Sequence, residues 1–213
     1  MKKENFQRLF SVFINAILAL FFLFAGNAAS APIGGLMNTG VDAMGVVLAS
    51  GSMEINYANT FSAVVNPTPG SPSWVSAPGD AEWIGPDGGG AEGSFLYTLT
   101  FDLSGLDPST AIITGNWSID NTGEIYLNGV WTGVELTSAT SFSTLHSFTI
   151  NSGFVEGLNT LIFDVTNAGS GSPTGLIVSG MSGTADPVPI PAAMWLFGSG
   201  LIGLISIRRR LNN

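Results

Sequence analysis

The sequence predicts an all-β fold, an antiparallel β-sandwich of the jelly-roll type. Three observations predict it. Several short segments alternate apolar and polar residues, turn-forming residues separate these segments at regular spacing, and no long helical pattern appears in the middle of the chain. Glycine and proline are abundant, with 28 and 11 residues in a chain of 213, which suits short strands joined by many turns. A closed barrel is the alternative architecture.

The clearest strand is SFLYTLTFDL, residues 94–103. Its alternate positions form an apolar face that we expect to point into a core, made of Phe95, Tyr97, Leu99, Phe101 and Leu103. In AIITGNWSID, residues 111–120, the side chains of Ile113, Trp117 and Ile119 share one face. We therefore expect Trp117 to lie in the core.

The other strands follow from shorter apolar runs. A strand over residues 124–127 precedes Asn128-Gly129, the strongest short signal for a tight hairpin. Later strands are expected at residues 146–151, 158–167 and 174–183, and earlier ones at 45–50, 53–58 and 61–66. About eight or nine short strands favour a sandwich of two sheets.

Two stretches, DNTGEIYLNGVWTG and FVEGLNTLIFDVTNAG, sharpen this prediction. They are similar to galactose-binding-like sandwich domains, in which a strand ending in Asn-Gly pairs with a strand introduced by Gly-x-Asn-x-Leu. The matching residues are Asn128-Gly129 and the run 157–161. The resemblance covers about residues 95–179 and implies a fold that serves binding, adhesive and structural modules alike.

Charge is divided sharply along the chain. All six basic residues lie near the ends, at Lys2, Lys3 and Arg8 and at Arg208, Arg209 and Arg210, whereas the fifteen acidic residues lie almost entirely between them. Because binding to nucleic acid requires Lys and Arg to neutralise phosphates, the body is not expected to bind nucleic acid. The absence of cysteine excludes disulfides and thiolate metal sites.

The N-terminal segment has the layout of a secretory signal peptide. A basic start is followed by an apolar run over residues 9–25 and then by small residues. Cleavage after Ala28, Ala29 or Ala31 fits the sequence, and an uncleaved anchor is the alternative. The predicted organisation is a signal peptide at 1–29, the sandwich at 30–184 and a C-terminal sorting segment at 185–213. The secretion translocase and signal peptidase are the partners this layout implies.

The C-terminal segment predicts a short transmembrane helix. Residues 192–207 carry no charge and span about 24 Å as a helix, against about 30 Å for the hydrocarbon core. Tilt and the preceding residues make a crossing feasible. The three arginines that follow are expected on the cytoplasmic side. Since the basic N-terminus also starts inside, both ends place the acidic body across the membrane.

VPIPAAMWLFGSGLIGLISIRRR resembles the PEP-CTERM class of sorting signals, in its VPLPA-like variant. The resemblance covers about the last 25 residues. It implies an exported protein recognised by an exosortase-like membrane protease or transpeptidase in a Gram-negative bacterium. The protein would be held transiently in the inner membrane, then sorted to the cell surface or matrix, with a structural or adhesive role in exopolysaccharide and biofilm. The middle of Pro189-Ile190-Pro191 departs from the Pro-Glu-Pro that names the class. The proline motif is Val188, Pro189, Ile190, Pro191 and Ala192, and the stop signal is Trp195, Leu196, Phe197, Gly198, Arg208, Arg209 and Arg210.

Catalytic patterns are scarce in the body. His146 is the sole histidine, so a Ser-His-Asp triad would depend on it. No nucleophile elbow or P-loop occurs. A glycosidase built on two carboxylates is the remaining enzymatic alternative. The Gly-rich loop near residue 85 suggests a structural Ca²⁺ site made of hard oxygen ligands. Its candidate ligands are Asp80, Glu82 and Asp87 in or beside this loop and Asp120 at the start of another loop. Solvated turn residues are the alternative reading.

Aromatic side chains are the candidates for binding a ligand. Trp74 and Trp131 are expected at the surface, and Trp83 lies among acidic residues. Such rings stack on sugars while carboxylates hydrogen-bond hydroxyl groups. The sequence therefore predicts a structural or adhesive surface protein, with a carbohydrate-binding module for a specific glycan as the alternative.

Overall fold

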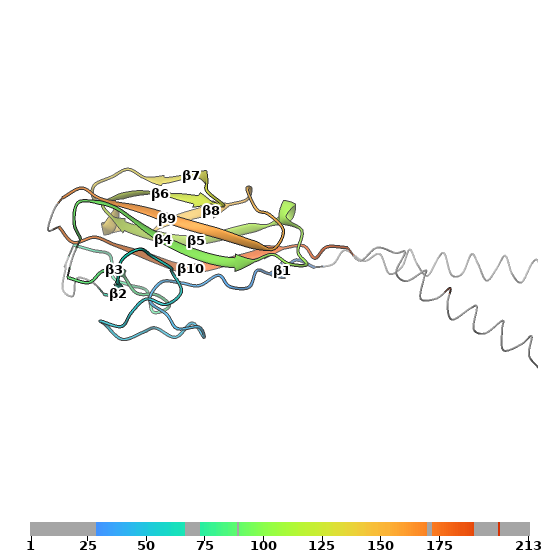
Figure 1. Ribbon diagram of the computed structural model, residues 1–213, viewed down its shortest axis with the longest axis horizontal. Coiled ribbons are helices and arrows are strands. Elements are labelled where there is room, and N and C mark those ends of the chain that lie inside the picture. Colours follow the sequence, from blue (N-terminus) through green and yellow to red (C-terminus); the bar gives the residue numbers. More distant parts are fainter. Residues whose placement is uncertain (1–28, 67–72, 89, 170–171, 190–199, 201–213) are drawn as a thin grey trace, which may run out of the picture.

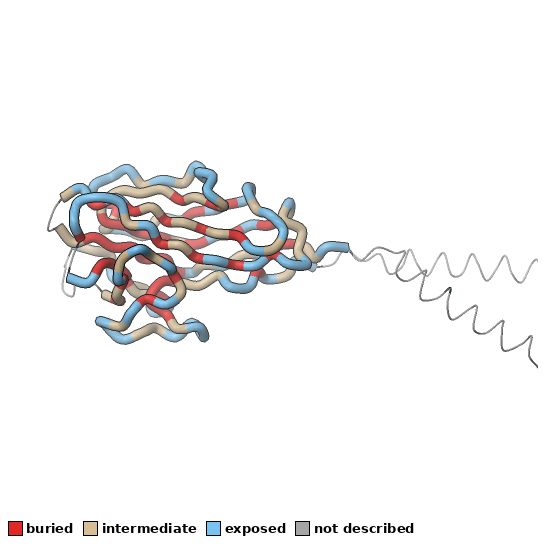
Figure 2. Tube along the Cα trace, viewed as in Figure 1, coloured by how far each residue is buried: buried red, intermediate tan, exposed pale blue. Residues whose placement is uncertain are grey.

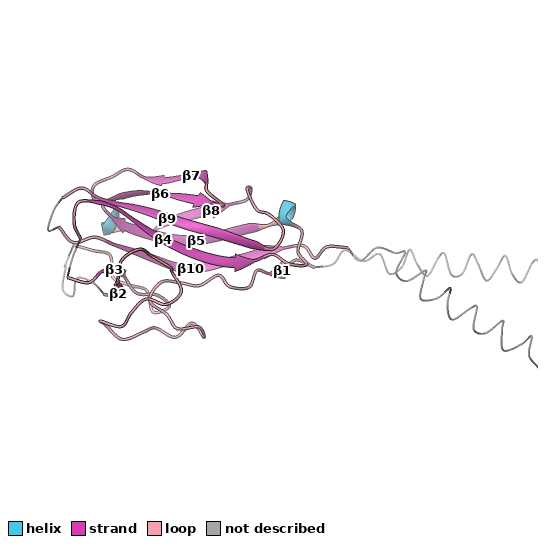
Figure 3. Ribbon diagram, in the orientation of Figure 1, coloured by secondary structure: helices cyan, strands magenta, loops and turns pink. Residues whose placement is uncertain are grey.

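The computed structural model describes residues 29–66, 73–88, 90–169, 172–189 and 200. These residues form an antiparallel β-sandwich whose helical elements are two short 3-10 turns, η1 (Pro108–Thr110) and η2 (Ser141–Ser143) (Figure 1, Figure 3). The strands are β1 (Ala31–Pro32), β2 (Ala63–Val65), β3 (Ile84–Pro86), β4 (Gly93–Asp102), β5 (Ile112–Asp120), β6 (Thr122–Leu127), β7 (Val130–Leu136), β8 (His146–Ile150), β9 (Leu158–Asn167) and β10 (Gly175–Ala185).

The strands form two sheets. Sheet A has the order β2-β3-β10-β5-β8, with β1 also paired to β10, and sheet B has the order β4-β9-β6-β7. From β3 to β10 the chain crosses between the sheets at nearly every connection, and β6 and β7 alone follow one another within a sheet. This connectivity is that of a jelly roll. The predicted all-β sandwich is confirmed, and the described strands do not close into one barrel.

The core lies between the sheets and follows the predicted alternation. Along β4 the inward residues are buried from Tyr97 to Leu103, and along β5 the inward set includes Trp117, which is 1% exposed. Trp117 lies against Phe163 of β9, with 5.8 Å between the ring centroids, so the two sheets meet through aromatic contacts. Figure 2 shows the same alternation of buried and less buried positions along the long strands.

A tight hairpin joins β6 to β7 as predicted. Asn128 and Gly129 have φ values of 52° and 78°, the left-handed pair that a type I′ turn needs. Asn128 also contacts β9, because its side-chain oxygen accepts a hydrogen bond from the Thr160 N–H at 2.9 Å and its amide donates to Asn159 Oδ1 at 2.8 Å. Since β9 lies centrally in sheet B, between β4 and β6, these bonds fix the hairpin to the middle of the sheet.

The segment before β3 differs from the prediction. Of the three early strands expected, only residues 63–65 form one, and residues 45–50 and 53–58 contribute isolated bridges. The buried carboxylate of Glu54 explains this, since it accepts hydrogen bonds from the backbone N–H groups of Gly40, Ile55, Asn56 and Tyr57. A side chain that satisfies these donors replaces the ladder of a sheet.

The two ends of the sandwich chain lie together (Figure 1). In β1, Ala31 pairs with Ala185 of β10, and the Ser30 hydroxyl donates to Asp186 at 2.6 Å. Past β10, the Val188 N–H donates to the Gly105 carbonyl at 2.9 Å. Backbone contacts with the sandwich therefore continue past β10 as far as Val188.

Among the described residues, no helix has the length and apolar character needed to cross a membrane. The predicted signal peptide, apart from Ala29, lies outside the described residues. So does the predicted C-terminal helix, apart from Gly200, with Arg208, Arg209 and Arg210. The same holds for Ile190, Pro191 and Ala192 of the proline motif.

Candidate functional site

Trp74 and Trp83 pack against each other. Their rings lie against one another, with centroids 4.3 Å apart, and Trp83 is 5% exposed. They cover Ile177 of β10. Its neighbours Leu176 and Val178 point into the main core, and because side chains alternate along a strand, Ile177 points to the opposite face. Trp74 is only partly exposed, since the loop that carries it folds back over the outer face of sheet A. Trp83 is likewise a packing residue.

Asp120 is buried beneath Trp74. Its Oδ2 accepts a hydrogen bond from Trp74 Nε1 at 3.0 Å, while its Oδ1 has no hydrogen-bond partner among the described residues. Burial raises the pKa of the Asp120 carboxyl to about 6, and the hydrogen bond from Trp74 opposes this rise. The Asp120 carboxyl is thus largely removed from solvent, beneath the loop that carries Trp74.

The predicted calcium ligands are not brought together. Within the ranges that the structure describes, no group of three or more acidic or histidine side chains is placed to hold a metal ion. Asp80 instead accepts hydrogen bonds from Asn38 Nδ2 and the Gly180 N–H, at 3.0 and 2.9 Å, and so joins the N-terminal segment to β10. Asp120 is engaged by Trp74, and Asp87 lies exposed in a turn. The structure therefore does not bring Asp80, Glu82, Asp87 and Asp120 together as one set of ligands.

Trp131 lies at the surface as predicted, with 51% of its area exposed. In β7 it pairs directly with Tyr126 of β6, which pairs with Ile162 of β9. Directly paired residues present their side chains on the same face of a sheet. Ile125 and Leu127 point into the core, so Trp131, Tyr126 and Ile162 lie on the outer face of sheet B. We call Trp131 and Tyr126 the aromatic row.

A row of carboxylates lies beside the aromatic row. Glu124 of β6 pairs with Glu135 of β7 on one side and with Asp164 of β9 on the other. These three residues, the acidic row, line a hollow of about 250 Å³ together with neighbouring threonines of β6 and β9. Like charges placed directly opposite one another destabilise a sheet. The sequence offers no Lys or Arg between residues 9 and 207 to offset them.

Two hydroxyl groups organise the acidic row. The Tyr126 hydroxyl donates a hydrogen bond to Glu124, and the Ser94 hydroxyl of β4 donates to Asp164. The hydrogen bond to Glu124 is the largest cause that raises the pKa of the Tyr126 phenol above its ordinary value. Tyr126 therefore stays a neutral hydrogen-bond donor at physiological pH, and its ring is fixed beside the carboxylates.

The sequence did not reveal the acidic row. A regular ladder continued from the Tyr126–Trp131 pair would set Glu124 opposite Gly133. The pairing is irregular between Tyr126 and Glu124, and Glu135 takes that place instead. The alternation of residues around Glu124 and Tyr126 indicates that both side chains point outward. The irregular pairing of β7, however, has no sequence signal other than Gly133, which has a φ of 82°.

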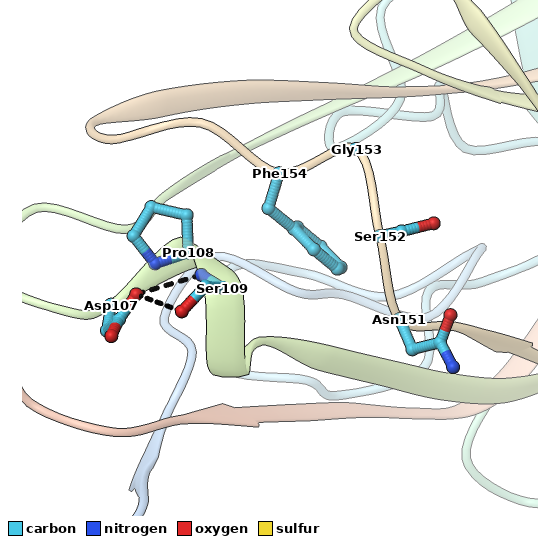
Figure 4. Close-up of a pocket in the computed structure, with 7 residues that line it drawn as sticks. All are labelled: Asp107, Pro108, Ser109, Asn151, Ser152, Gly153 and Phe154. Atoms are coloured by element: carbon cyan, nitrogen blue, oxygen red, sulfur yellow. Dashed lines mark hydrogen bonds between the residues drawn. The ribbon is translucent and has the colours of Figure 1, made fainter.

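A second hollow, of about 450 Å³, lies between η1 and the loop before β9. Figure 4 shows the Phe154 ring between Pro108 and Asn151, and Asp107 at one side with its carboxylate turned toward Ser109. That carboxylate accepts hydrogen bonds from the Ser109 N–H and hydroxyl at 2.9 and 2.7 Å, which lowers the pKa of Asp107. Because its acid caps η1, this hollow is less suited to a ligand than the outer face of sheet B.

His146 offers no catalytic arrangement within the described part of the chain. Its Nε2 lies 3.2 Å from the Thr144 hydroxyl, and no serine or carboxylate hydrogen-bonds to the ring there. The triad alternative is not supported.

No protein-family model and no curated protein matches the chain. Solved structures similar to it include a family 35 carbohydrate-binding module from Paenibacillus barcinonensis, 17% identical, over 59% of this chain and 91% of that one at a TM-score of 0.35. A family 35 module from Clostridium thermocellum is 10% identical, over 61% and 88% of the two chains at a TM-score of 0.34. The module CsCBM6-3 from Clostridium stercorarium, solved with cellobiose, is 16% identical, over 60% and 95% at 0.33.

Proposed function

We propose that this domain is a non-enzymatic carbohydrate-binding module and that its ligand lies on the outer face of sheet B. The observation that carries the proposal is the aromatic row directly beside the acidic row. Trp131 supplies an exposed ring, and Glu124, Glu135 and Asp164 supply acceptors within one or two strands of it. This assigns the function to a site that contains one of the three predicted tryptophans.

The chemistry of a sugar fits these two rows. The axial C–H groups of a pyranose form an apolar face that packs on an indole or phenol ring, and the equatorial hydroxyls at its edge donate to carboxylates. Neighbouring strands lie about 4.8 Å apart. The acidic row, spread over three strands, therefore extends about 10 Å and can follow more than one sugar unit.

Trp131→Ala is expected to weaken binding to the glycan at least tenfold, because it removes the exposed stacking surface. Binding is measured by isothermal titration calorimetry after a ligand has been found on a glycan array. Trp131→Phe should retain most of the affinity. Val130→Ala is the matched control, since Val130 is exposed on the same strand but pairs with the inward-facing Leu127.

Unchanged binding by folded Trp131→Ala would place the ligand elsewhere on the domain. A parent protein that binds no glycan on the array contradicts the proposal as a whole. The same samples also test the absence of catalysis: an oligosaccharide that is bound but not cleaved agrees with a binding module, and cleavage lost in Glu124→Gln would instead make the domain a glycosidase.

We propose further that the domain works at the cell surface, where its predicted terminal segments would deliver it and where it holds exopolysaccharide. The position of the sandwich ends supports this, since Ser30 and Asp186 are hydrogen-bonded to each other. Both terminal segments would then start from one end of the domain and could reach the same membrane. A cut after Ala29 would leave Ser30 and β1 in place.

Mass spectrometry of protein recovered from cells and medium tests the delivery. We expect an N-terminus at residue 29 or 30 and the loss of residues 195–210 from the surface form. An intact segment 195–210 in all recovered protein would mean permanent anchoring in place of sorting. An N-terminus at Met1 in that protein would remove the signal peptide from the proposal.

A further inference from the structure

We propose that the ligand of the outer face of sheet B is a cationic glycan, a polymer of hexosamine units that carry free amino groups. This inference rests on the proposed function and names the class of sugar. A neutral glycan needs hydrogen-bond acceptors but no net charge, whereas this face places three carboxylates in adjacent positions beside an exposed indole.

The acidic row places three like charges at paired positions on adjacent strands. Glu124 lies between Asp164 and Glu135 on neighbouring strands, and each pair stands directly opposite in the ladder. Their side chains face one another at the distance of ordinary cross-strand neighbours, where like charges repel. Within the described residues no basic side chain is available to any of them, because the sequence has none between residues 9 and 207.

A ligand with positive charges would remove this repulsion. Ammonium groups repeated along a polymer would each lie against a carboxylate, and charge-assisted hydrogen bonds are the stronger kind. The rest of the body adds to the attraction, because its charged side chains are all negative. A surface potential of one sign speeds the approach of a cationic partner. An anionic polysaccharide would meet repulsion at the same face.

The aromatic row explains why the cation should be a sugar. An ammonium group over the face of an indole or phenol is favoured by the charge distribution of the ring, and Trp131 is open to solvent next to Tyr126. A pyranose ring bearing an amino group satisfies both rows at once, with its C–H face on Trp131 and its ammonium on the acidic row. Leu96, half-exposed opposite Asp164 on β4, extends the apolar border of the face.

Calorimetry with three hexasaccharides tests the inference on the intact domain. The probes are a β-1,4-linked glucosamine hexamer, its N-acetylated form and a glucose hexamer, each at low and at high salt. We expect the glucosamine hexamer to bind at least tenfold more tightly than the other two, with an affinity that falls as salt is raised. The triple variant Glu124→Gln, Glu135→Gln, Asp164→Asn should lose this preference. It should also remain folded, because the substitutions relieve repulsion.

Glu156→Gln is the matched control, since Glu156 is an exposed acid outside sheet B. It should leave binding unchanged, and an equal loss in Glu156→Gln would show general attraction to a polyanion and overturn the inference. Equal affinity for all three hexamers, with loss in Trp131→Ala, would retain the proposed function and reject the cationic ligand. Binding of no glycan at all would reject both. A short oligolysine peptide that displaces the glucosamine hexamer at equal concentration would make a basic protein segment the partner instead.

Discussion

Asn159→Ala is expected to destabilise the domain by about 3 to 5 kcal/mol, because a buried amide would lose four hydrogen bonds and leave their partners unsatisfied. Asn159 Oδ1 accepts from the Val155 N–H at 2.9 Å and from Asn128 Nδ2 at 2.8 Å. Its Nδ2 donates to the carbonyls of Val155 and Gly157, both at 2.8 Å. One side chain thus fixes the turn into β9 and the β6–β7 hairpin together.

Asn159→Ala should also weaken ligand binding on the outer face of sheet B. Asn128 holds the left-handed turn that sets Tyr126 opposite Trp131, and Asn159 holds Asn128. Urea denaturation measures the change in stability, and Asn151→Ala serves as the matched control because Asn151 is exposed. A loss below about 1 kcal/mol for Asn159→Ala would mean that water replaces the amide and that the turn is held by its backbone alone.

Asp120 is expected to make the domain more stable as the pH falls from 7.5 to about 4. The pKa of Asp120 is raised by burial from an ordinary value of 3.8 to about 6 in the folded state. The folded protein therefore binds this proton more tightly than the unfolded chain. The stability that the proton confers is complete below pH 4 and is lost as the pH rises through 6. A shift of this size corresponds to about 2 to 3 kcal/mol.

Asp120→Asn removes this titration and keeps an acceptor for Trp74 Nε1. The difference in unfolding free energy between the parent and this variant should therefore change by about 2 to 3 kcal/mol between pH 7.5 and pH 4. Urea denaturation across that range measures it. Comparing the two proteins cancels the general effect of protonating other acids on a chain with a formal charge of −9. Parallel pH profiles would mean that Asp120 is solvated in the folded state.

Much of the fold could be predicted because its signals are local. The alternation in residues 94–103 identifies β4, and the inward set from Tyr97 to Leu103 is buried as its period requires. Asn128-Gly129 locates the β6–β7 hairpin for a similar reason, since both residues tolerate positive φ. β3 escaped prediction because three residues ending in Pro86 carry too little pattern to indicate a strand.

The candidate site could be predicted only in part. Trp131 follows a tight turn in an edge strand, and its exposure is deducible from that position. Trp74 and Trp83 have similar polar and Gly-rich surroundings in the sequence, yet a loop folds them over Ile177 of β10. Nothing near Trp74 in the chain indicates that contact, because its partner lies about a hundred residues away.

Sequence patterns alone identified the long strands β4, β5 and β9, the hairpin, the separation of charge and the exposed aromatic residue that follows the hairpin turn. These properties depend on residues within a few positions of each other, where periodicity and backbone preference act. The pairing of distant strands, in contrast, places Glu124, Glu135 and Asp164 in one row beside Trp131. That row depends on which strands become neighbours and on the irregular register of β7. Both are set by packing between distant parts of the chain.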